Sequence, residues 1–533
     1  MPGNLSCGAA IAGLLEAYGV DTVFGIPGVH TLELYKGLAA SSMRHVLVRH
    51  EQGAGFMADG YARASGRPGV CFVITGPGVT NIATAMGQAM SDSVPMLVIS
   101  SVNALTDLGK GRGRLHEISD QRAVTEPIAA ASRIATDPAD IVEFIHLAFS
   151  SFASARPRPM HLSVPLDVLA GPAEGEWGAG AMAPRPAPDE ASVRAAREWL
   201  AGAHRPAFLL GGGAIDVPQA QIVRLAESTG AAVVTTTAGK GIVPESHHLS
   251  LGATLSCGPT QSLLADADCV LVIGSELSET DSWTDDPLQL GGTIVRVDIA
   301  EAQLTVNADP ALAIRSDAAA FVEALGGPRA SLPANRQHRR IAAARQEISA
   351  GWGALERTHI RVLDTIRAVL PAQGFIATDM TQIAYTGNTA FPVDRPRCWF
   401  HPLGFGTLGY ALPAAIGAKL ADSRRPGVAL TGDYGFQFTL PELGTAVELG
   451  LTLPVLVWNN DGLGQIRDGM IAAGIPETGV TAVNPDFQVL AKAYGCRATR
   501  PSSLEALAED LRDALAASGP TLIEIRQDMP GLA

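Results

Sequence analysis

Residues Gly427 to Gly464 read GVALTGDYGFQFTLPELGTAVELGLTLPVLVWNNDGLG, and this stretch indicates the fold of the chain. It begins with an apolar segment, Gly427 to Leu430, which predicts a buried strand followed by Gly432-Asp433. A helical segment separates it from a second apolar strand, Leu453 to Trp458, which is followed by Asn459-Asn460. Strand, helix and strand in this order are typical of an α/β protein with a parallel sheet. The polar residues then share the edge of the sheet where ligands bind.

These polar residues suit a hard cation that carries a diphosphate. Mg²⁺ prefers an octahedron of oxygen ligands at about 2.0 to 2.1 Å, shared between protein, phosphate and water. Asp433 offers a carboxylate, Asn460 an amide oxygen and Gly462 a backbone carbonyl, and the neighbouring glycines let the backbone approach an anion closely. Gly-Asp or Asn-Asn alone is usually a turn. The pairs Gly432-Asp433 and Asn459-Asn460 each follow an apolar strand, and together they predict a metal–diphosphate site.

The stretch resembles the diphosphate and magnesium motif of thiamine diphosphate (ThDP) enzymes, in which Gly-Asp-Gly precedes Asn-Asn by some two dozen residues. This resemblance implies ThDP and Mg²⁺ as cofactors, with Asp433, Asn460 and Gly462 as the metal ligands. Tyr434 stands where the family commonly has glycine. The implied cofactor contacts in this motif are Gly432, Asp433, Tyr434, Gly435, Asn460, Gly462, Leu463 and Gly464.

Length and charge limit the class of protein. A chain of 533 residues is long enough for three or more domains with buried cores. Lys plus Arg number 39 and Asp plus Glu 53, so the net charge of 39 − 53 = −14 argues against a nucleic-acid or anionic membrane partner. A small-molecule substrate fits this balance better.

The cysteine pattern and hydropathy predict a cytoplasmic protein. The six cysteines form neither a C-x-x-C pair nor a zinc spacing, so a disulfide framework and a cysteine metal site are not indicated. No basic start with an apolar core occurs at the N-terminus, and no run of about 18 apolar residues appears. We therefore expect a reducing cytosol, no secretion and no membrane span.

Alternating strand and helix patterns divide the chain into three units. Residues 171–190, rich in Gly, Pro and Ala, predict a first linker, and the basic run Arg336 to Arg340 predicts a second one with a solvated surface. We predict an α/β fold with three doubly wound parallel-sheet domains at residues 1–172, 190–328 and 354–533. The resemblance, which covers essentially the whole chain, implies that these are pyrimidine-binding, central and diphosphate-binding domains.

The first domain carries the glutamate that the family requires. Glu51 directly follows a predicted strand, and its segment RHEQGAGFMADGYA resembles the family's glutamate motif along its whole length. The resemblance implies that Glu51 hydrogen-bonds ring nitrogen N1′ of the cofactor and favours the imino tautomer that deprotonates the thiazolium C2. Without the motif, Glu51 would be an ordinary acidic residue in a helix first turn. Gly25 and Pro27, in the turn after an earlier predicted strand, are implied cofactor contacts.

Leu408 lies in the run Gly404-Phe-Gly-Thr-Leu-Gly-Tyr. It matches the bulky apolar residue that holds the family's cofactor in a bent V shape. Gly406 and the glycine after Leu408 leave room for the cofactor against the backbone. Ordinary core packing is the alternative role, and the two are physically compatible.

Two histidines are candidates for proton transfer. His30 follows the Gly-Ile-Pro-Gly turn, near the position where related decarboxylases carry Asp or Ser. His116 lies in Arg114-Leu-His-Glu, which aligns with the Ala-Phe-Gln-Glu run of acetolactate synthases. Histidine near neutral pH suits donation of a proton after CO₂ leaves. For each of them, a hydrogen-bonding structural role is the alternative.

Departures from the acetolactate synthases predict a roomier substrate pocket. Counting from Asn460, their substrate-selecting tryptophan is replaced by Gly469, and the phenylalanine of Ala-Phe-Gln-Glu is replaced by Leu115. Asp468 could pair with a guanidinium group, although an exposed helix carboxylate is the alternative. With Gln465, these residues form the candidate substrate set.

The resemblance is strongest to the acetolactate synthase and 2-oxo acid decarboxylase branch, and several segments resemble 5-guanidino-2-oxopentanoate (2-ketoarginine) decarboxylases. It implies decarboxylation of a 2-oxo acid through an enamine on ThDP. The alternative is a carboligase that condenses the enamine with a second 2-oxo acid or aldehyde. A homodimer or homotetramer with active sites between subunits is implied, so that Glu51 and Asp433 meet across an interface. FAD in the central domain is possible but not favoured.

Overall fold

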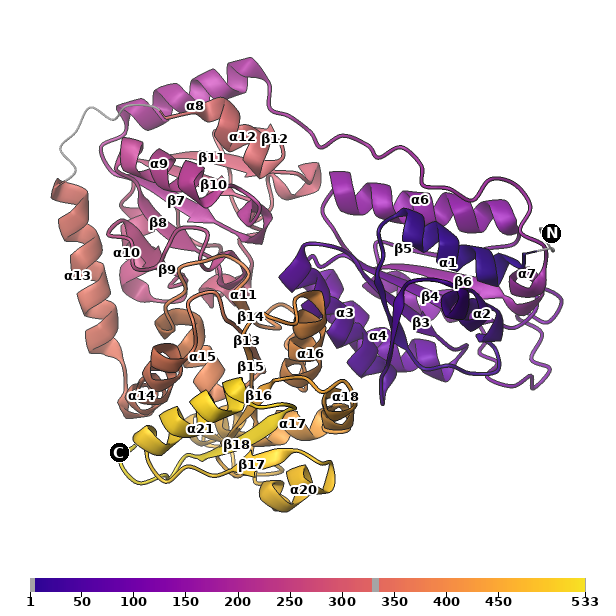
Figure 1. Cartoon of the computed structure of the whole chain (residues 1–533). Helices are drawn as coiled ribbons and strands as arrows, with labels where there is room; N and C mark the ends of the chain where they lie inside the picture. The colour runs from indigo at the N-terminus through magenta and orange to yellow at the C-terminus, as the bar shows by residue number, and fades with distance from the viewer. Residues whose placement is uncertain (1–4, 328–334, 533) are drawn as a thin grey trace.

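The computed structural model describes residues 5–327 and 335–532, and these form three six-stranded sheets whose strands run parallel (Figure 1). Helices cover the sheets, so the predicted α/β fold with three parallel-sheet units is confirmed. The domain bounds themselves stay predictions. Among the described residues, no helix is long and apolar enough to cross a membrane.

The first sheet has the strand order β2-β1-β3-β4-β6-β5. Its strands are β1 (Thr22–Gly25), β2 (Arg44–Leu47), β3 (Gly69–Val73), β4 (Met96–Val102), β5 (Ala131–Ile134) and β6 (Met160–Pro165). Its helices are α1 (Cys7–Ala17), α2 (Leu32–Ala40), α3 (Glu51–Ser65), α4 (Pro77–Ser91), α5 (Gln121–Thr125), η1 (Glu126–Ile128), α6 (Pro138–Ser154) and α7 (Leu166–Ala170).

The second sheet has the order β12-β11-β10-β7-β8-β9. Its strands are β7 (Pro206–Leu210), β8 (Ala232–Thr235), β9 (Ser250–Gly252), β10 (Cys269–Ile273), β11 (Thr293–Asp298) and β12 (Leu312–Arg315). The accompanying helices are α8 (Glu190–Gly202), η2 (Gly212–Ala214), α9 (Gln219–Thr229), η3 (Thr237–Gly239), α10 (Gly258–Ala265), α11 (Glu279–Ser282), η4 (Glu301–Gln303), α12 (Ala318–Leu325) and α13 (Asn335–Gly351).

The third sheet has the order β14-β13-β15-β16-β18-β17. Its strands are β13 (Phe375–Thr378), β14 (Trp399–Phe400), β15 (Gly427–Gly432), β16 (Pro454–Asn459), β17 (Arg497–Thr499) and β18 (Thr521–Arg526). Its helices are α14 (Ala354–Val369), α15 (Gln382–Ala390), α16 (Ala411–Ala421), α17 (Asp433–Phe438), α18 (Glu442–Glu448), α19 (Gly464–Ala472), α20 (Phe487–Ala493) and α21 (Leu504–Ala516).

Strand alternation explains why helices cover both faces of these sheets. In β3, Val70 and Phe72 enter one apolar core, while Cys71 and Val73 enter another on the opposite face. Because successive side chains of a strand point to opposite faces, a continuously apolar strand needs cover on both. The core that contains Cys71 continues into the third sheet.

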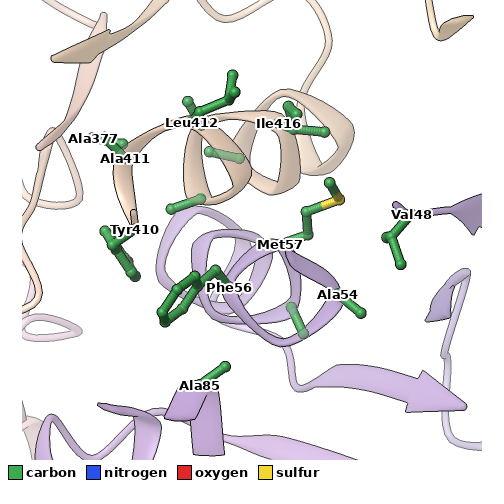
Figure 2. Packing of buried hydrophobic residues seen from close by; sticks show 14 of the residues in the cluster. Val48, Ala54, Phe56, Met57, Ala85, Ala377, Tyr410, Ala411, Leu412 and Ile416 are labelled. Carbon is green, nitrogen blue, oxygen red and sulfur yellow. The ribbon is translucent and has the colours of Figure 1, made fainter. Parts of the chain in front are cut away.

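Helices α3 and α16 join the first and third sheets (Figure 2). A Cβ placed on Gly60 would stand 2.0 Å from the Ala414 carbonyl oxygen, and one placed on Gly417 would stand 1.9 Å from the Met57 carbonyl oxygen. These glycines therefore permit backbone-to-backbone contact between the helices. Figure 2 shows Phe56 and Tyr410 side by side where the helices meet, with ring centroids 5.4 Å apart.

One sequence prediction about the second linker is wrong. The basic run Arg336 to Arg340, predicted to belong to a solvated linker, lies in helix α13. Apolar residues of this helix, Ile341 and Ala344, are buried in the core of the second sheet. The prediction weighed the charges and not the apolar residues that follow them at helical spacing.

Candidate active site

Asp433 lies where strand β15 ends and helix α17 begins. Its carboxylate is buried, and Oδ2 accepts hydrogen bonds from Gly462 N at 3.1 Å and from Asn484 Nδ2 at 2.6 Å. Burial raises the pKa of Asp433 above its ordinary value. Strand β16 runs beside β15 with Trp458 opposite Gly432, which places Asn460 next to this carboxylate.

Three oxygen atoms converge beside Asp433. The amide oxygen of Asn460 lies 3.1 Å from Asp433 Oδ1 and 2.8 Å from the Gly462 carbonyl oxygen. Adjacent ligands in a Mg²⁺ octahedron are about 2.8 to 3.0 Å apart, from ligand distances of about 2.0 to 2.1 Å. Turning the Asn460 amide would convert both contacts into hydrogen bonds. In the orientation of the structure, a cation between the oxygens would remove their mutual repulsion.

The close packing around these oxygens requires glycine at position 462 and favours it at positions 432 and 435. Gly462 has φ of +155°, and a Cβ there would stand 2.2 Å from the Val480 carbonyl oxygen. A Cβ on Gly432 would meet Thr381 Oγ1 at 2.9 Å, and one on Gly435 would meet Asp379 Oδ2 at 3.1 Å. Tyr434, the departure from the family motif, lies in the first turn of α17 without a positive φ and is 37% exposed. This position therefore accepts a side chain without backbone strain.

Leu408 is half-buried in the loop between β14 and α16. Asp379 fixes this loop, because both of its carboxylate oxygens accept from Gly409 N at 3.0 Å. Asp379 also accepts from Thr431 Oγ1 at 3.0 Å, and its burial raises its pKa to about 6. Gly406 in the same loop has φ of +66° and is exposed. Asp379 thus links the loop of Leu408 to strand β15, which ends directly before Asp433.

Glu51 is the first residue of helix α3 and is 7% exposed. Its Oε2 accepts a hydrogen bond from Asn81 Nδ2 at 2.9 Å, and no residue described in the structure hydrogen-bonds its other oxygen. The preceding backbone is anchored by the third sheet's unit, since Glu442 Oε1 accepts from Arg49 N and His50 N at 3.0 Å each. One oxygen of Glu51 is therefore available to a ligand.

His30 and His116 meet at the edge of the first sheet. Their rings form an edge-to-face pair with centroids 5.3 Å apart. His30 Nδ1 lies 3.2 Å from Thr75 Oγ1, and burial together with His116 lowers the pKa of His30. His116 has a positive φ of 59°. A Cβ on Gly76 would stand 2.4 Å from the carbonyl oxygen of His116, so the glycine leaves room for that carbonyl. The lowered pKa favours the neutral form of His30 at neutral pH.

The predicted contacts Gly25 and Pro27 lie in the same region. Gly25 ends strand β1, and a Cβ there would stand 2.1 Å from the Phe72 carbonyl oxygen. Pro27 is exposed in the turn that leads to His30. Gly25 is thus buried at the end of the strand, and Pro27 lies in the exposed turn between it and His30.

The candidate substrate residues are open to solvent. Leu115 is 59% exposed beside His116, and Gln465 and Gly469 are exposed on helix α19. A Cβ on Gly469 would have nothing within 4 Å, and the roomier pocket stays a prediction. Asp468 Oδ2 accepts a hydrogen bond from Gln382 Nε2 at 2.8 Å, and its side chain is 50% exposed.

The predicted residues thus form two groups. Glu51, His30 and His116 belong to the first sheet's unit, and Asp433 and Leu408 belong to the third. Among the described residues, no hydrogen bond joins a side chain of the first group to one of the second. The two groups therefore belong to different units of the chain.

Sequence reasoning missed four residues that hold these groups: Asn81, Asp379, Gln382 and Asn484. Asp379 had a visible signal, since it directly follows an apolar strand as Asp433 does. Asn484 lies between α19 and α20 in a segment without regular structure, where spacing carries no information. Asn81 and Gln382 lie on helices α4 and α15, where a single amide side chain has no distinguishing pattern.

Comparison with known proteins gives matches along the whole chain. The family "Thiamine pyrophosphate enzyme, N-terminal TPP binding domain" matches residues 5–124, the corresponding "central domain" matches 193–325, and the "C-terminal TPP binding domain" matches 379–525. The probable 2-ketoarginine decarboxylase of Pseudomonas aeruginosa is 53% identical over 98% of this chain and 94% of its own length.

Acetolactate synthases are more distant relatives. The isozyme 1 large subunit of Escherichia coli is 30% identical over 97% of this chain and 93% of its own length. The large subunit of Corynebacterium glutamicum is 30% identical over 95% of this chain and 84% of its own length. The matches include the elements that carry both groups of site residues.

Proposed function

The chain belongs to the thiamine pyrophosphate enzymes, and we propose that it is a Mg²⁺-dependent decarboxylase of 5-guanidino-2-oxopentanoate that releases CO₂ and an aldehyde. The observation that supports this substrate is the 53% identity, over 98% of the chain, to a probable 2-ketoarginine decarboxylase. Identity to the two acetolactate synthases is 30% in each case. A carboligase is therefore the second candidate.

The residues present fit the cofactor and its metal. Asp433, Asn460 and Gly462 present three oxygens at distances that suit a Mg²⁺ octahedron. Mg²⁺ in turn would hold the diphosphate, beside the backbone of Gly432, Tyr434, Gly435, Leu463 and Gly464. When bound, ThDP supplies the nucleophilic carbon and accepts the electrons released by decarboxylation. Leu408 and Gly406 would support the middle of the cofactor.

Glu51 would address the aminopyrimidine end through its free carboxylate oxygen. Asn81 holds the other oxygen at 2.9 Å and so fixes the plane of the carboxylate. A hydrogen bond to ring nitrogen N1′ requires that one oxygen be free and pre-oriented. His30 and His116 would move or hold protons at the substrate oxygen and at the product carbon, and Gly25 and Pro27 would border the ring.

Asp468 would recognise the guanidinium end of the substrate. Its Oδ2 accepts from Gln382, and Oδ1 is 3.9 Å from Arg467 Nε, so the carboxylate keeps acceptor capacity toward solvent. Leu115, Gln465 and Gly469 would leave space for the long chain. Replacing Asp468 by Ala should raise the KM for 5-guanidino-2-oxopentanoate and spare that for 2-oxohexanoate, which has no guanidinium. An equal rise for both substrates would contradict this role.

Two copies would complete each site. The edges of both groups carry exposed apolar side chains, including Val29 at 61% and Phe438 at 50%, and a second copy would cover them. A mixture of Glu51→Gln and Asp433→Asn subunits tests this, because a mixed dimer regains one intact site. With random exchange, about a quarter of wild-type activity should return. No recovery on subunit exchange would contradict a shared site.

A flavin is not part of the proposal, although a cavity that the central unit lines together with the other two units leaves room for a nucleotide. A cavity of 480 Å³ includes Gly212, Ser275 and Asp298 at the ends of strands β7, β10 and β11. Arg156 Nη2 already pairs with Asp298 at 2.9 Å, and release of CO₂ and an aldehyde needs no electron acceptor. The absorption spectrum of the purified protein tests this point, and a bound flavin would contradict it.

A substrate panel with product identification tests the proposed reaction. The protein with ThDP and Mg²⁺ should release CO₂ from 5-guanidino-2-oxopentanoate faster than from pyruvate. Acetolactate formed from pyruvate, without CO₂ release from the guanidino acid, would favour the carboligase instead.

A further inference from the structure

We propose that Asp468 and Gln382 are positioning residues that hold the amide of Asn460 in the orientation that a cation at Asp433 requires. The inference rests on the proposed function, because it concerns the same metal site. It assigns Asp468 a task separate from contact with substrate.

A chain of side-chain hydrogen bonds leads from helix α19 to the cation site. Gln382, the first residue of α15, donates from Nε2 to Asp468 Oδ2 at 2.8 Å. A carboxylate only accepts hydrogen bonds, so Gln382 must direct its NH₂ group to Asp468 and its oxygen elsewhere. That oxygen accepts from Asn460 Nδ2 at 3.3 Å. The Asn460 oxygen is then left on the side of Asp433 and Gly462.

The lack of a side chain at Gly464 independently supports the contact between Gln382 and Asn460. A Cβ at this position would stand 2.3 Å from Gln382 Oε1 and 2.6 Å from Asn460 Nδ2. Any side chain here would push the two amides apart. Glycine at position 464 therefore leaves the space in which the side-chain amides of Gln382 and Asn460 meet.

The opposite orientation of Asn460 would close the cation site. Its nitrogen would donate to Asp433 Oδ1 at 3.1 Å and to the Gly462 carbonyl at 2.8 Å, which fills the position of the metal. The Asn460 oxygen would then face Gln382 Oε1 at 3.3 Å. Turning Gln382 to relieve that contact would bring its oxygen against the Asp468 carboxylate. Asp468 thus disfavours the closed arrangement through Gln382.

The test is metal affinity measured without substrate. Purified protein freed of cofactor is titrated with Mg²⁺ at fixed ThDP, and tryptophan fluorescence reports ThDP binding. Asp468→Ala should raise the Mg²⁺ concentration for half-saturation by about tenfold, the effect of one lost charge-assisted hydrogen bond. Asp468→Asn keeps an acceptor oxygen for Gln382 and should stay within about threefold of the wild type. Gly464→Ala should raise the midpoint as Asp468→Ala does.

Arg467→Ala is the matched control for charge. Arg467 Nε lies 3.9 Å from Asp468 Oδ1, so its removal changes the local charge without breaking the hydrogen bond to Gln382. Its midpoint should not rise. An unchanged Mg²⁺ midpoint in Asp468→Ala would overturn the inference. Equal rises of the midpoint in Asp468→Asn and Asp468→Ala would also overturn it, because they would show that only the charge of Asp468 matters. A wild type whose ThDP binding ignores Mg²⁺ would overturn the proposed metal site itself.

Discussion

Asp433→Asn should abolish cofactor binding while it preserves or raises the stability of the cofactor-free protein. Asparagine has the size of aspartate, but the change removes the negative charge. Asp433 is the only carboxylate among the three groups whose oxygens face one another, the other two being the Asn460 amide and the Gly462 carbonyl. At a ligand concentration of about 100 Kd, binding stabilises the wild type by about 2.7 kcal/mol. For a unit of about 150 to 250 residues this corresponds to about 5 to 11 °C in Tm. The variant should lose this shift.

The cofactor-free variant should be stabilised by about 1 kcal/mol, the scale of one recovered hydrogen bond. Its amide oxygen can still accept from Asn484 Nδ2 and Gly462 N, which bond Asp433 at 2.6 and 3.1 Å. Burial raises the pKa of Asp433, so its carboxylate costs stability above that pKa, and the cost disappears as pH falls through it. The advantage of the variant should therefore be present at neutral pH and shrink in acid.

Thermal unfolding with and without ThDP and Mg²⁺, from weakly acidic to neutral pH, measures both effects. Asp461→Asn is the matched control, because Asp461 adjoins the site but pairs with Arg526 at 3.1 and 3.0 Å. Its positive φ of 55° suits asparagine. This control should keep the cofactor-dependent shift. A shift retained in Asp433→Asn, or a cofactor-free variant less stable than the wild type, would refute the reasoning.

Three further changes separate binding, catalysis and packing. Glu51→Gln should keep ThDP binding in calorimetric titration but lower CO₂ release by at least about 100-fold, since proton transfer to the ring is lost; unchanged activity would exclude the mechanism. Leu408→Ala should weaken ThDP binding and cost the cofactor-free protein only about 1 kcal/mol, because the side chain is half-buried; a large loss of Tm with normal binding would indicate a core role. Gly417→Ala should destabilise by about 3 kcal/mol or more, because its Cβ would stand 1.9 Å from the Met57 carbonyl oxygen. Gly351→Ala on α13, with nothing within 4 Å, is the control and should leave Tm unchanged.

The sequence was sufficient for the fold class and the family because their signals are local. The strands of the opening stretch appear as β15 and β16, and the polar residues after them adjoin as parallel pairing requires. The resemblance to ThDP enzymes is confirmed by family matches to all three units. Strand β18, which lies between β16 and the edge strand β17, was not predicted, because Glu524 interrupts its apolar run.

The supporting contacts of the site were beyond sequence reasoning because they join residues far apart in the chain. Glu442 belongs to the opening stretch, yet its carboxylate anchors the turn before Glu51. For Asp468 the sequence left open a substrate contact and an exposed helix carboxylate. Its bond to Gln382 depends on two helices that lie far apart in the sequence. The roles of the individual site residues stay predictions until the variants are measured.

Release of labelled CO₂ from 5-guanidino-2-[1-¹³C]oxopentanoate tests the central claim most directly. The protein is first freed of cofactor and then supplied with ThDP, with Mg²⁺, with both, or with neither. We predict labelled CO₂ and the corresponding aldehyde when both are present, and none when either is absent. Full cofactor loading without labelled CO₂, or release that does not depend on ThDP, would contradict the account.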